Sequence, residues 1–306
     1  MRPIPKTTPA LSTVRPIDEG FTHFIFDFDG TITTKDTINV IAQIGIMKHD
    51  SDGSFETKWT KIVQKYQDEL DHYAEQYSPK PSERTTLEEE IKFQRSLQGI
   101  ELRSFNRIST SGLLAGISKA EWEIAGCTAV ALSLVEIREG FKELVKEIEM
   151  RNGVWGVVSA NFSKDFIRGV LMKCLEDRDI AIPIMANSVD EHGFLKGLVI
   201  DETGLETILA TSNTKLLAMR HLLKLWKLDG DVKVVYYGDS LTDLECLFDP
   251  AVKGVVVGDH GSTSLLRALV AQKTPPLVET YTPDFETNAL VELPGRAAQK
   301  VDGPEG

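Results

Sequence analysis

From residue 136 onward, short apolar segments alternate with segments in which apolar residues recur every three or four positions. The first pattern predicts buried strands and the second predicts amphipathic helices. Strands are expected at Val154–Val158, Ile182–Met185, Val232–Tyr237 and Gly254–Val257, with helices between them. Such alternation is typical of a doubly wound parallel sheet with helices on both faces. We therefore predict an α/β fold of this kind.

One more strand is expected far earlier, at Phe21–Phe28, and it is separated from the others by about a hundred residues of helical periodicity. Two pairs in that stretch have the spacing of capping boxes that open helices, Thr86 with Glu89 and Ser118 with Glu121. The helical stretch is therefore predicted to be an insertion after the first strand. The predicted parts are flexible tails at 1–20 and 281–306, an α/β core at 21–35 and 136–280, and an all-helical inserted domain at 36–135.

Composition narrows the possible partners. The chain has 34 Lys and Arg against 46 Asp and Glu, a net charge of −12, which argues against a nucleic-acid-binding surface. Since no apolar run approaches the roughly 18 residues that a bilayer span needs, no membrane partner is expected. Three widely spaced cysteines suit no disulfide framework and indicate a reducing compartment. With no targeting signal recognised, a cytoplasmic location is expected.

Polar residues gather just after the predicted strands. Ligands of open α/β sheets bind outside the carboxyl ends of the strands, so these residues are the candidate site. The candidates are Asp27 and Asp29 after the first strand, Ser159 and Ala160 after the second, Asp239 and Asp243 after the strand Val232–Tyr237, and Lys215 near the start of the helix before that strand. Carboxylates do not converge without a cation, and oxygen ligands without nearby His or Cys favour Mg²⁺.

The order DxDGT, Ser, Lys, GDxxxD resembles that of the haloacid dehalogenase (HAD) superfamily phosphatases, with a Rossmann-like core and a helical cap. The resemblance implies that Asp27 is a nucleophile that forms an aspartyl-phosphate, and that Asp29 is the general acid and base. It further implies that Mg²⁺ is held by the Asp27 carboxylate, the Asp29 carbonyl and Asp239, with Asp243 as a further or outer ligand. Ser159, the Ala160 N–H and Lys215 would hold the phosphoryl oxygens.

The helical insertion is similar to the cap of the phosphoserine phosphatase branch. That branch binds the substrate amino group through a Glu nine residues after the nucleophile, a position occupied here by Asp36. Two features depart from the branch: Ser159-Ala160-Asn161 replaces a Gly-rich motif, and its carboxylate-binding arginine has no clear counterpart, the candidates being Arg95, Arg103 and Arg107. More loosely, GVVSAN and YYGDSLTDLECL resemble the HAD domain of plant thiamin monophosphate phosphatases and fungal relatives. This resemblance implies that cap aromatic residues could stack a heterocycle.

Each candidate also has a purely structural interpretation. Asp239 or Asp36 could be a helix N-cap, and Ser159 could start a helix. Lys215 could be an ordinary surface lysine, in which case Lys164 or Lys196 would take its place. The cap aromatic residues could simply pack the helices together, as residues at helical spacing usually do.

These observations predict an Mg²⁺-dependent phosphomonoester hydrolase acting on a small phosphorylated metabolite. Thiamin monophosphate, a phosphoserine-like ester and a nucleoside monophosphate are the candidate substrates. A phosphotransferase on the same core is an alternative, because sequence does not distinguish water from another acceptor. From a different class, the chain could be a catalytically silent HAD-fold binding protein, although such proteins usually lose one of the three aspartates Asp27, Asp29 and Asp239. The oligomeric state is left open.

Overall fold

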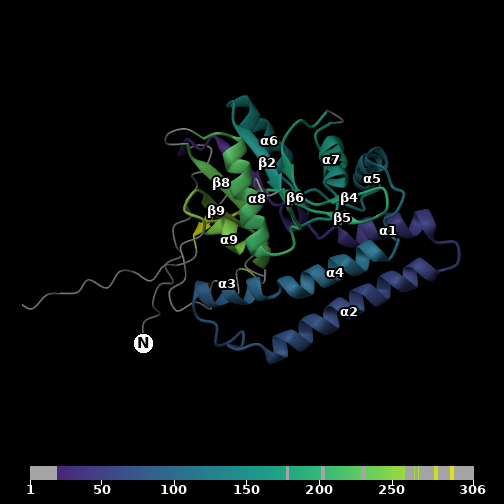
Figure 1. Cartoon of the computed structure of the whole chain (residues 1–306). Helices are drawn as coiled ribbons and strands as arrows, with labels where there is room; N and C mark the ends of the chain where they lie inside the picture. The colour runs from purple at the N-terminus through teal and green to yellow at the C-terminus, as the bar shows by residue number, and fades with distance from the viewer. Residues whose placement is uncertain are drawn as a thin grey trace, which may run out of the picture.

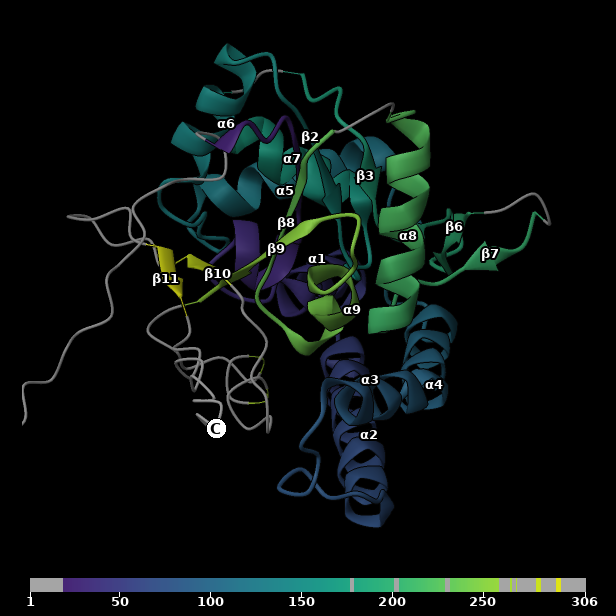
Figure 2. The ribbon, with the colours of Figure 1, turned by 90° about the vertical axis from the view of Figure 1, so that its left-hand side faces the viewer.

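A computed structural model of the chain describes residues 19–176, 179–200, 204–228 and 232–258, together with 265, 268, 279–281 and 290–292. It has a central sheet with helices on both faces, and long helices form a further layer beside it (Figures 1 and 2). None of the described helices is both long and apolar enough to cross a bilayer.

The central sheet has the strand order β11-β10-β9-β8-β1-β2-β3 and is parallel except for β11, which pairs antiparallel with β10. Its strands are β1 (His23–Phe26), β2 (Val154–Val158), β3 (Ile184–Met185), β8 (Val234–Gly238), β9 (Lys253–Val257), β10 (Glu279–Tyr281) and β11 (Leu290–Glu292). Two small antiparallel pairs lie outside it, namely β4 (Ser188–Val189) with β5 (Leu195–Lys196) and β6 (Leu198–Val199) with β7 (Glu206–Thr207).

The strand order reverses at β1. The chain leaves β1 and returns first as β2 on one side and later as β8 on the other. Loops that follow the strands on either side of such a switch point run in opposite directions and leave a crevice at the carboxyl edge, where α/β proteins bind ligands. The residues after β1, β2 and β8 therefore meet at this point.

Helices cover both faces and form the further layer. They are α1 (Ile38–His49), α2 (Ser54–Gln76), α3 (Leu87–Ser96), α4 (Gln98–Thr110), α5 (Lys119–Ala131), α6 (Phe141–Met150), α7 (Lys164–Cys174), α8 (Ser212–Leu225) and α9 (Leu244–Leu247). Both capping boxes predicted from sequence are present, since Thr86 opens α3 with Glu89 and Ser118 opens α5 with Glu121.

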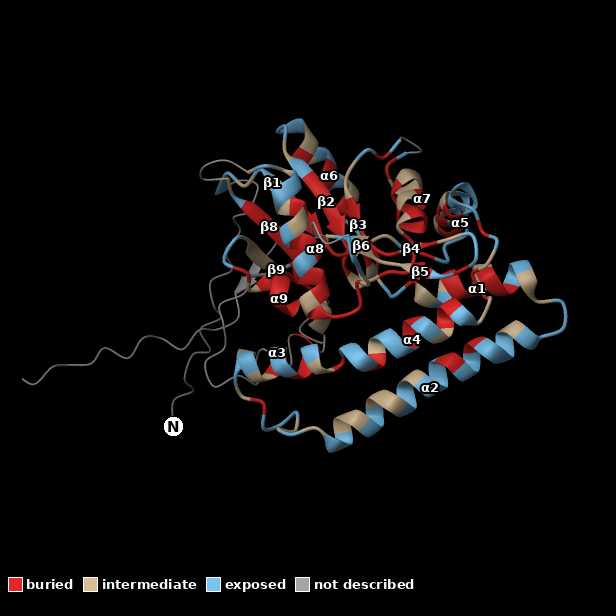
Figure 3. Cartoon of the chain, in the orientation of Figure 1, coloured by how far each residue is buried: buried red, intermediate tan, exposed pale blue. Residues whose placement is uncertain are grey.

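Both faces of the sheet are buried, as Figure 3 shows for β2 and β8. Along β1, Phe24 and Phe26 pack into one core with α6 and α7, whereas Ile25 packs into a second core with α8 and α9. Alternate residues of a strand point to opposite faces, so an apolar strand with no polar face requires cover on both sides. The predicted doubly wound fold is confirmed.

The helices between β1 and α6 do not all pack in the same place. α5 packs closely against α7. A Cβ atom added to Gly126 would lie 2.3 Å from the carbonyl oxygen of Phe166, and a Cβ atom added to Gly169 would lie only 1.9 Å from the carbonyl oxygen of Glu123. Glycines at these two positions let the helix backbones approach. α2, α3 and α4 instead form the outer layer (Figure 1).

Several element bounds differ from those predicted. β1 ends at Phe26, two residues early, because the chain turns from Asp27 onward. β11 falls inside the segment 281–306 that was predicted to be a tail. The sequence also predicts a helix at 265–270 from its apolar spacing, but most of that stretch lies outside the described residues, as do nearly all of the two tails. The division into core, cap and tails stays a prediction.

Candidate active site

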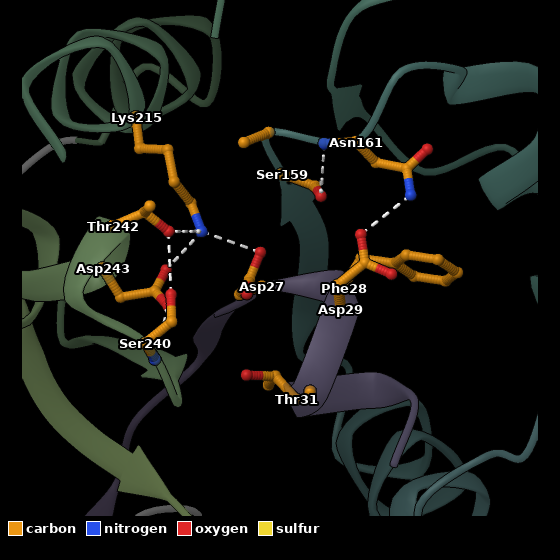
Figure 4. Close-up of polar contacts among 12 residues, drawn as sticks. Asp27, Phe28, Asp29, Thr31, Ser159, Asn161, Lys215, Ser240, Thr242 and Asp243 are labelled. Atoms are coloured by element: carbon orange, nitrogen blue, oxygen red, sulfur yellow. Dashed lines mark hydrogen bonds and ion pairs between the residues drawn. The ribbon is translucent and has the colours of Figure 1, made fainter. Parts of the chain in front are cut away.

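Asp27 lies at the start of the turn after β1 and is joined to Asp243 through Lys215. The Lys215 ammonium lies 2.8 Å from Asp27 Oδ1 and donates to Asp243 Oδ1 at 2.5 Å (Figure 4). All three side chains are at most 5% exposed. Burial opposes the charge on Lys215, but the two carboxylates outweigh it and raise the pKa of the ammonium. Lys215 is therefore a buried cation of the site, and its interpretation as a surface lysine is wrong.

Asp243 has every carboxylate oxygen occupied by the protein. Oδ1 also accepts the Tyr236 hydroxyl at 2.7 Å, and Oδ2 accepts the backbone N–H and the hydroxyl of Ser240 at 3.1 and 2.9 Å. Ser240 and Asp243 also form a capping box at the start of the short helical turn after β8. Asp243 thus positions Lys215 and the loop after β8, which agrees better with an outer role than with direct binding of a metal.

Asp239 approaches the turn after β1 from the loop after β8. Its Oδ1 accepts the Thr31 hydroxyl at 2.9 Å. Gly30 has φ +78°, and a Cβ there would lie 2.2 Å from Asp239 Oδ2, so only glycine allows this approach. Arg138 fixes the same turn by donating to the carbonyl oxygens of Thr31 and Gly30 at 3.0 and 2.6 Å.

Three carboxylates, of which Asp27 and Asp243 are buried and Asp239 is half-buried, have the chemistry of a cation site. Oxygen atoms of Asp27, Asp239 and Asp243 all lie within 4.8 Å of one another. Burial, and after it repulsion from Asp243, raises the pKa of Asp27 well above its usual range and raises the pKa of Asp239 to about 7. The single ammonium of Lys215 therefore does not neutralise the three carboxylates. Asp27 and Asp239 each keep one oxygen without a partner among the described residues. These residues fit a hard divalent cation such as Mg²⁺.

Asp29 is held on the opposite side of the turn, away from Lys215 (Figure 4). Its Oδ1 accepts both the backbone N–H and the hydroxyl of Thr37, at 2.8 and 2.7 Å, and its Oδ2 accepts the Asn161 side-chain amide at 2.8 Å. Burial, with repulsion from Asp36, raises the pKa of Asp29 to about 6. A carboxyl with a pKa close to neutrality can donate and accept a proton in one reaction cycle.

The remaining candidates line the same cavity, whose volume is about 350 Å³. Ser159 and Ala160 reach it from the end of β2, and the Ser159 hydroxyl also accepts the backbone N–H of Asn161 at 3.1 Å. Asp36 lines the cavity as well, but its Oδ1 accepts the N–H of Ile38 at 2.8 Å, so it also helps to start α1. The structure thus brings together all the predicted site residues. Lys164 and Lys196 are not among the described residues that line this cavity.

Sequence reasoning assigned no role to Asn161, Thr37, Thr31, Tyr236 and Arg138. Asn161 stands in the strand-end segment Ser159-Ala160-Asn161, and this position was the only feature of the sequence that pointed to a role in the site. Tyr236 sits within an apolar strand, so its hydroxyl partner could not be anticipated. The other residues act through contacts across 100 or more positions of sequence, except Thr37, which lies eight residues from Asp29.

Three comparisons with known proteins bear on this site. The chain belongs to the haloacid dehalogenase-like hydrolase (HAD) family, whose model matches residues 24–247, from β1 to the end of α9. A "CTO1 family protein" of Schizosaccharomyces pombe is 26% identical over 231 residues, 73% of this chain and 77% of that protein. The family membership agrees with the resemblance seen in the motifs.

Among solved structures, a substrate-bound phosphoserine phosphatase complex is 19% identical, with a TM-score of 0.45 over 83% of this chain and 91% of that chain. A phosphoserine phosphohydrolase-like protein from Francisella tularensis is 19% identical, with a TM-score of 0.43 over 78% of this chain and 88% of that chain.

Proposed function

We propose that this chain is an Mg²⁺-dependent hydrolase of phosphomonoesters of a small metabolite, acting through an aspartyl-phosphate. Its membership of the HAD hydrolase family supports the class of reaction. The observation that carries the proposal is the convergence of Asp27, Asp239 and Lys215 on one cavity, with Asp29 held apart from them. A carboxylate nucleophile, a cation site and a separate acid are what this chemistry needs.

The proposed first step forms a bond between an Asp27 carboxylate oxygen and phosphorus. The bond from phosphorus to the ester oxygen breaks, and Asp29 gives its proton to the departing alcohol. Lys215 orients the nucleophile and offsets the charge of the phosphoryl oxygens, while Ser159 and the Ala160 N–H are proposed to bind those oxygens. Asp27, Asp239 and the Asp29 carbonyl would hold Mg²⁺, which supplies positive charge that lets an anionic nucleophile approach an anionic ester.

In the second step, the Asp29 carboxylate takes a proton from water as the water oxygen attacks phosphorus. The bond from phosphorus to Asp27 breaks, so phosphate leaves and both aspartates return to their starting states. Asn161 and Thr37 keep the Asp29 carboxyl oriented during both transfers by donating to its oxygens. Asp36, where the catalytic cavity meets the inserted helices, is proposed as a substrate contact.

Hydrolysis of para-nitrophenyl phosphate, with and without Mg²⁺, tests the proposal. We expect turnover that needs Mg²⁺ and is abolished by Asp27→Asn, whereas Asp68→Asn on the exposed surface of α2 should leave it unchanged. Activity that survives Asp27→Asn would overturn the proposed mechanism. A panel of thiamin monophosphate, phosphoserine and nucleoside monophosphates would then rank the candidate substrates.

A further inference from the structure

A second cavity of about 440 Å³ adjoins the catalytic cavity. The two cavities share the wall residues Asp36, Ile38, Ala160 and Thr242, so they lie side by side. α2 and α4 of the outer layer provide much of the wall of the second cavity. An ester whose phosphoryl group lies beside Asp27 would have its alcohol portion in this second cavity. Its wall therefore bears on substrate choice.

The wall is largely apolar and aromatic. Trp59 and Ile62 come from α2, Phe105 and Ile108 from α4, and Phe162 from the segment after β2. Phe105 and Phe162 meet edge to face, with ring centroids 5.2 Å apart. The Trp59 ring N–H donates to the Asn39 side-chain oxygen at 3.0 Å, so its polar edge already has a partner. Such a wall suits a planar or apolar body better than a highly hydroxylated one.

One acidic group stands in this wall on α4. Glu101 Oε1 accepts the Tyr66 hydroxyl at 2.7 Å, and burial raises the pKa of the Glu101 carboxyl. The hydroxyl is a neutral donor, so it satisfies one oxygen and leaves the charge without a counterion. The Tyr66 pKa is raised as well, by burial and then by the Glu101 charge, so the tyrosine stays protonated as the donor.

No cation faces Glu101 among the described residues that line the cavity. The charged side chains there are Asp36 and Glu101, both acidic. Arg103 and Arg107, the nearest basic residues along α4, bind Glu69 of α2 at 3.0 and 2.9 Å, and neither lines the cavity. A ligand carboxylate would meet only negative charge here, whereas a ligand cation would replace the missing partner.

We propose that the alcohol portion of the substrate is an aromatic or heteroaromatic group that carries a positive charge or a strong N–H donor, and that Glu101 selects it. The inference rests on the proposed phosphatase function and adds the substrate class. The aromatic wall binds the body of the group and Glu101 binds its charge, partly as a cation beside aromatic rings. Esters of alcohols that bear a carboxylate are correspondingly disfavoured.

Binding of three free phenols tests the inference without any turnover. The probes 4-(aminomethyl)phenol, 4-(hydroxymethyl)phenol and 4-hydroxybenzoate have similar sizes and carry positive, zero and negative charge at neutral pH. Calorimetry on the whole chain should show the cation binding about tenfold tighter than the neutral phenol, the size expected for one partly buried charge contact. The anion should bind most weakly. Equal binding of the three probes would overturn the inference.

Substitutions identify the responsible group. Glu101→Gln keeps an acceptor for Tyr66 and removes the charge, so the tenfold advantage of the cation should disappear. Glu88→Gln, on the exposed side of α3 beside Lys92, is the matched control and should keep it. Should Glu101→Gln fail to fold, Tyr66→Phe provides the test. It leaves Glu101 charged, so it should preserve or increase the preference for the cationic phenol. A preference that survives Glu101→Gln, or that Tyr66→Phe abolishes, contradicts the assignment.

Hydrolysis of the three corresponding phosphate esters separates this inference from the proposed function. If none is hydrolysed in the presence of Mg²⁺, the phosphatase proposal fails, and with it the substrate class. If the esters are hydrolysed but kcat/KM does not follow the order cation, neutral, anion, the phosphatase proposal stands and the Glu101 assignment fails.

Discussion

The site has two ends, the catalytic cavity and the adjoining second cavity, and they satisfy their charges in different ways. At the catalytic end, Asp27, Asp243 and Lys215 form a chain of ion pairs, and Asp29 is held by Asn161 and other hydrogen-bond donors. At the end beside α2 and α4, the walls are apolar and aromatic and one carboxylate, Glu101, has only a neutral donor. Under the proposed function, the first end would hold the phosphoryl group that reacts, and the second would select the group attached to it.

This difference has an energetic consequence. Buried charges that share partners depend strongly on each other, so removing one leaves the rest uncompensated. Apolar contacts are weaker individually and tolerate replacement by residues of similar size. Changes at the catalytic end should therefore have large effects on both activity and stability, whereas changes at the other end should be modest and specific to the substrate.

Lys215→Met should have the largest effect. Without the ammonium, the Asp27 and Asp243 carboxylates face each other while buried, so the free energy of unfolding should fall by about 3 to 5 kcal/mol. Turnover of para-nitrophenyl phosphate should fall by about 10²- to 10³-fold, as for loss of one charge-stabilising donor. Urea denaturation without Mg²⁺ and steady-state kinetics measure both effects. The control Lys224→Met, at an exposed position of the same helix, should change neither stability nor turnover. A Lys215→Met protein as stable as the unmodified chain would contradict this prediction.

Asp239→Asn should have the next largest effect, on affinity for Mg²⁺. It removes one negative charge from the cation site but keeps an oxygen that can accept from Thr31, so we expect about 10- to 100-fold weaker binding in calorimetry. Asp71→Asn, exposed on α2, should bind Mg²⁺ like the unmodified chain. Equal affinity in the Asp239→Asn protein would remove Asp239 from the cation site.

Phe105→Leu should have the smallest effect. It loses the edge-to-face contact with Phe162 but keeps an apolar side chain, so stability should fall by only about 1 kcal/mol. KM for an aryl phosphate should rise a few-fold with little change in kcat, because the residue lines the cavity away from the reacting groups. Thermal denaturation measures the change in stability, and steady-state kinetics measure kcat and KM separately. A loss of kcat as large as that from Lys215→Met would erase the distinction between the two ends.

The catalytic end was predictable from sequence to a large extent, and the other end was not. Asp27 and Asp239 follow apolar strands, and the rule that strand ends converge is enough to bring them together. The burial of Lys215 was harder to predict, because it depends on the Asp27 and Asp243 carboxylates, which come from other parts of the chain. Glu101 gave no signal at all, since helical periodicity shows which residues share a face but not which tyrosine or cavity lies opposite.

Fold prediction shows the same division. The alternation of strands and helices predicts a sheet with both faces covered, because apolar strands such as Val154–Val158 have no polar side. The same periodicity could not indicate that α5 would lie against α7, where Gly126 and Gly169 allow close approach. A glycine inside a helix indicates a close helix contact only once the partner helix is known.

Chemical trapping of a phosphorylated Asp27 tests the central claim most directly. Hydroxylamine added during turnover of a phosphate ester with Mg²⁺ should intercept the acyl-phosphate, and mass spectrometry of peptides should find a hydroxamate at Asp27. Omission of the ester should leave the residue unmodified. Sustained release of phosphate while Asp27 remains unmodified under conditions that trap a reference acyl-phosphate would contradict the account.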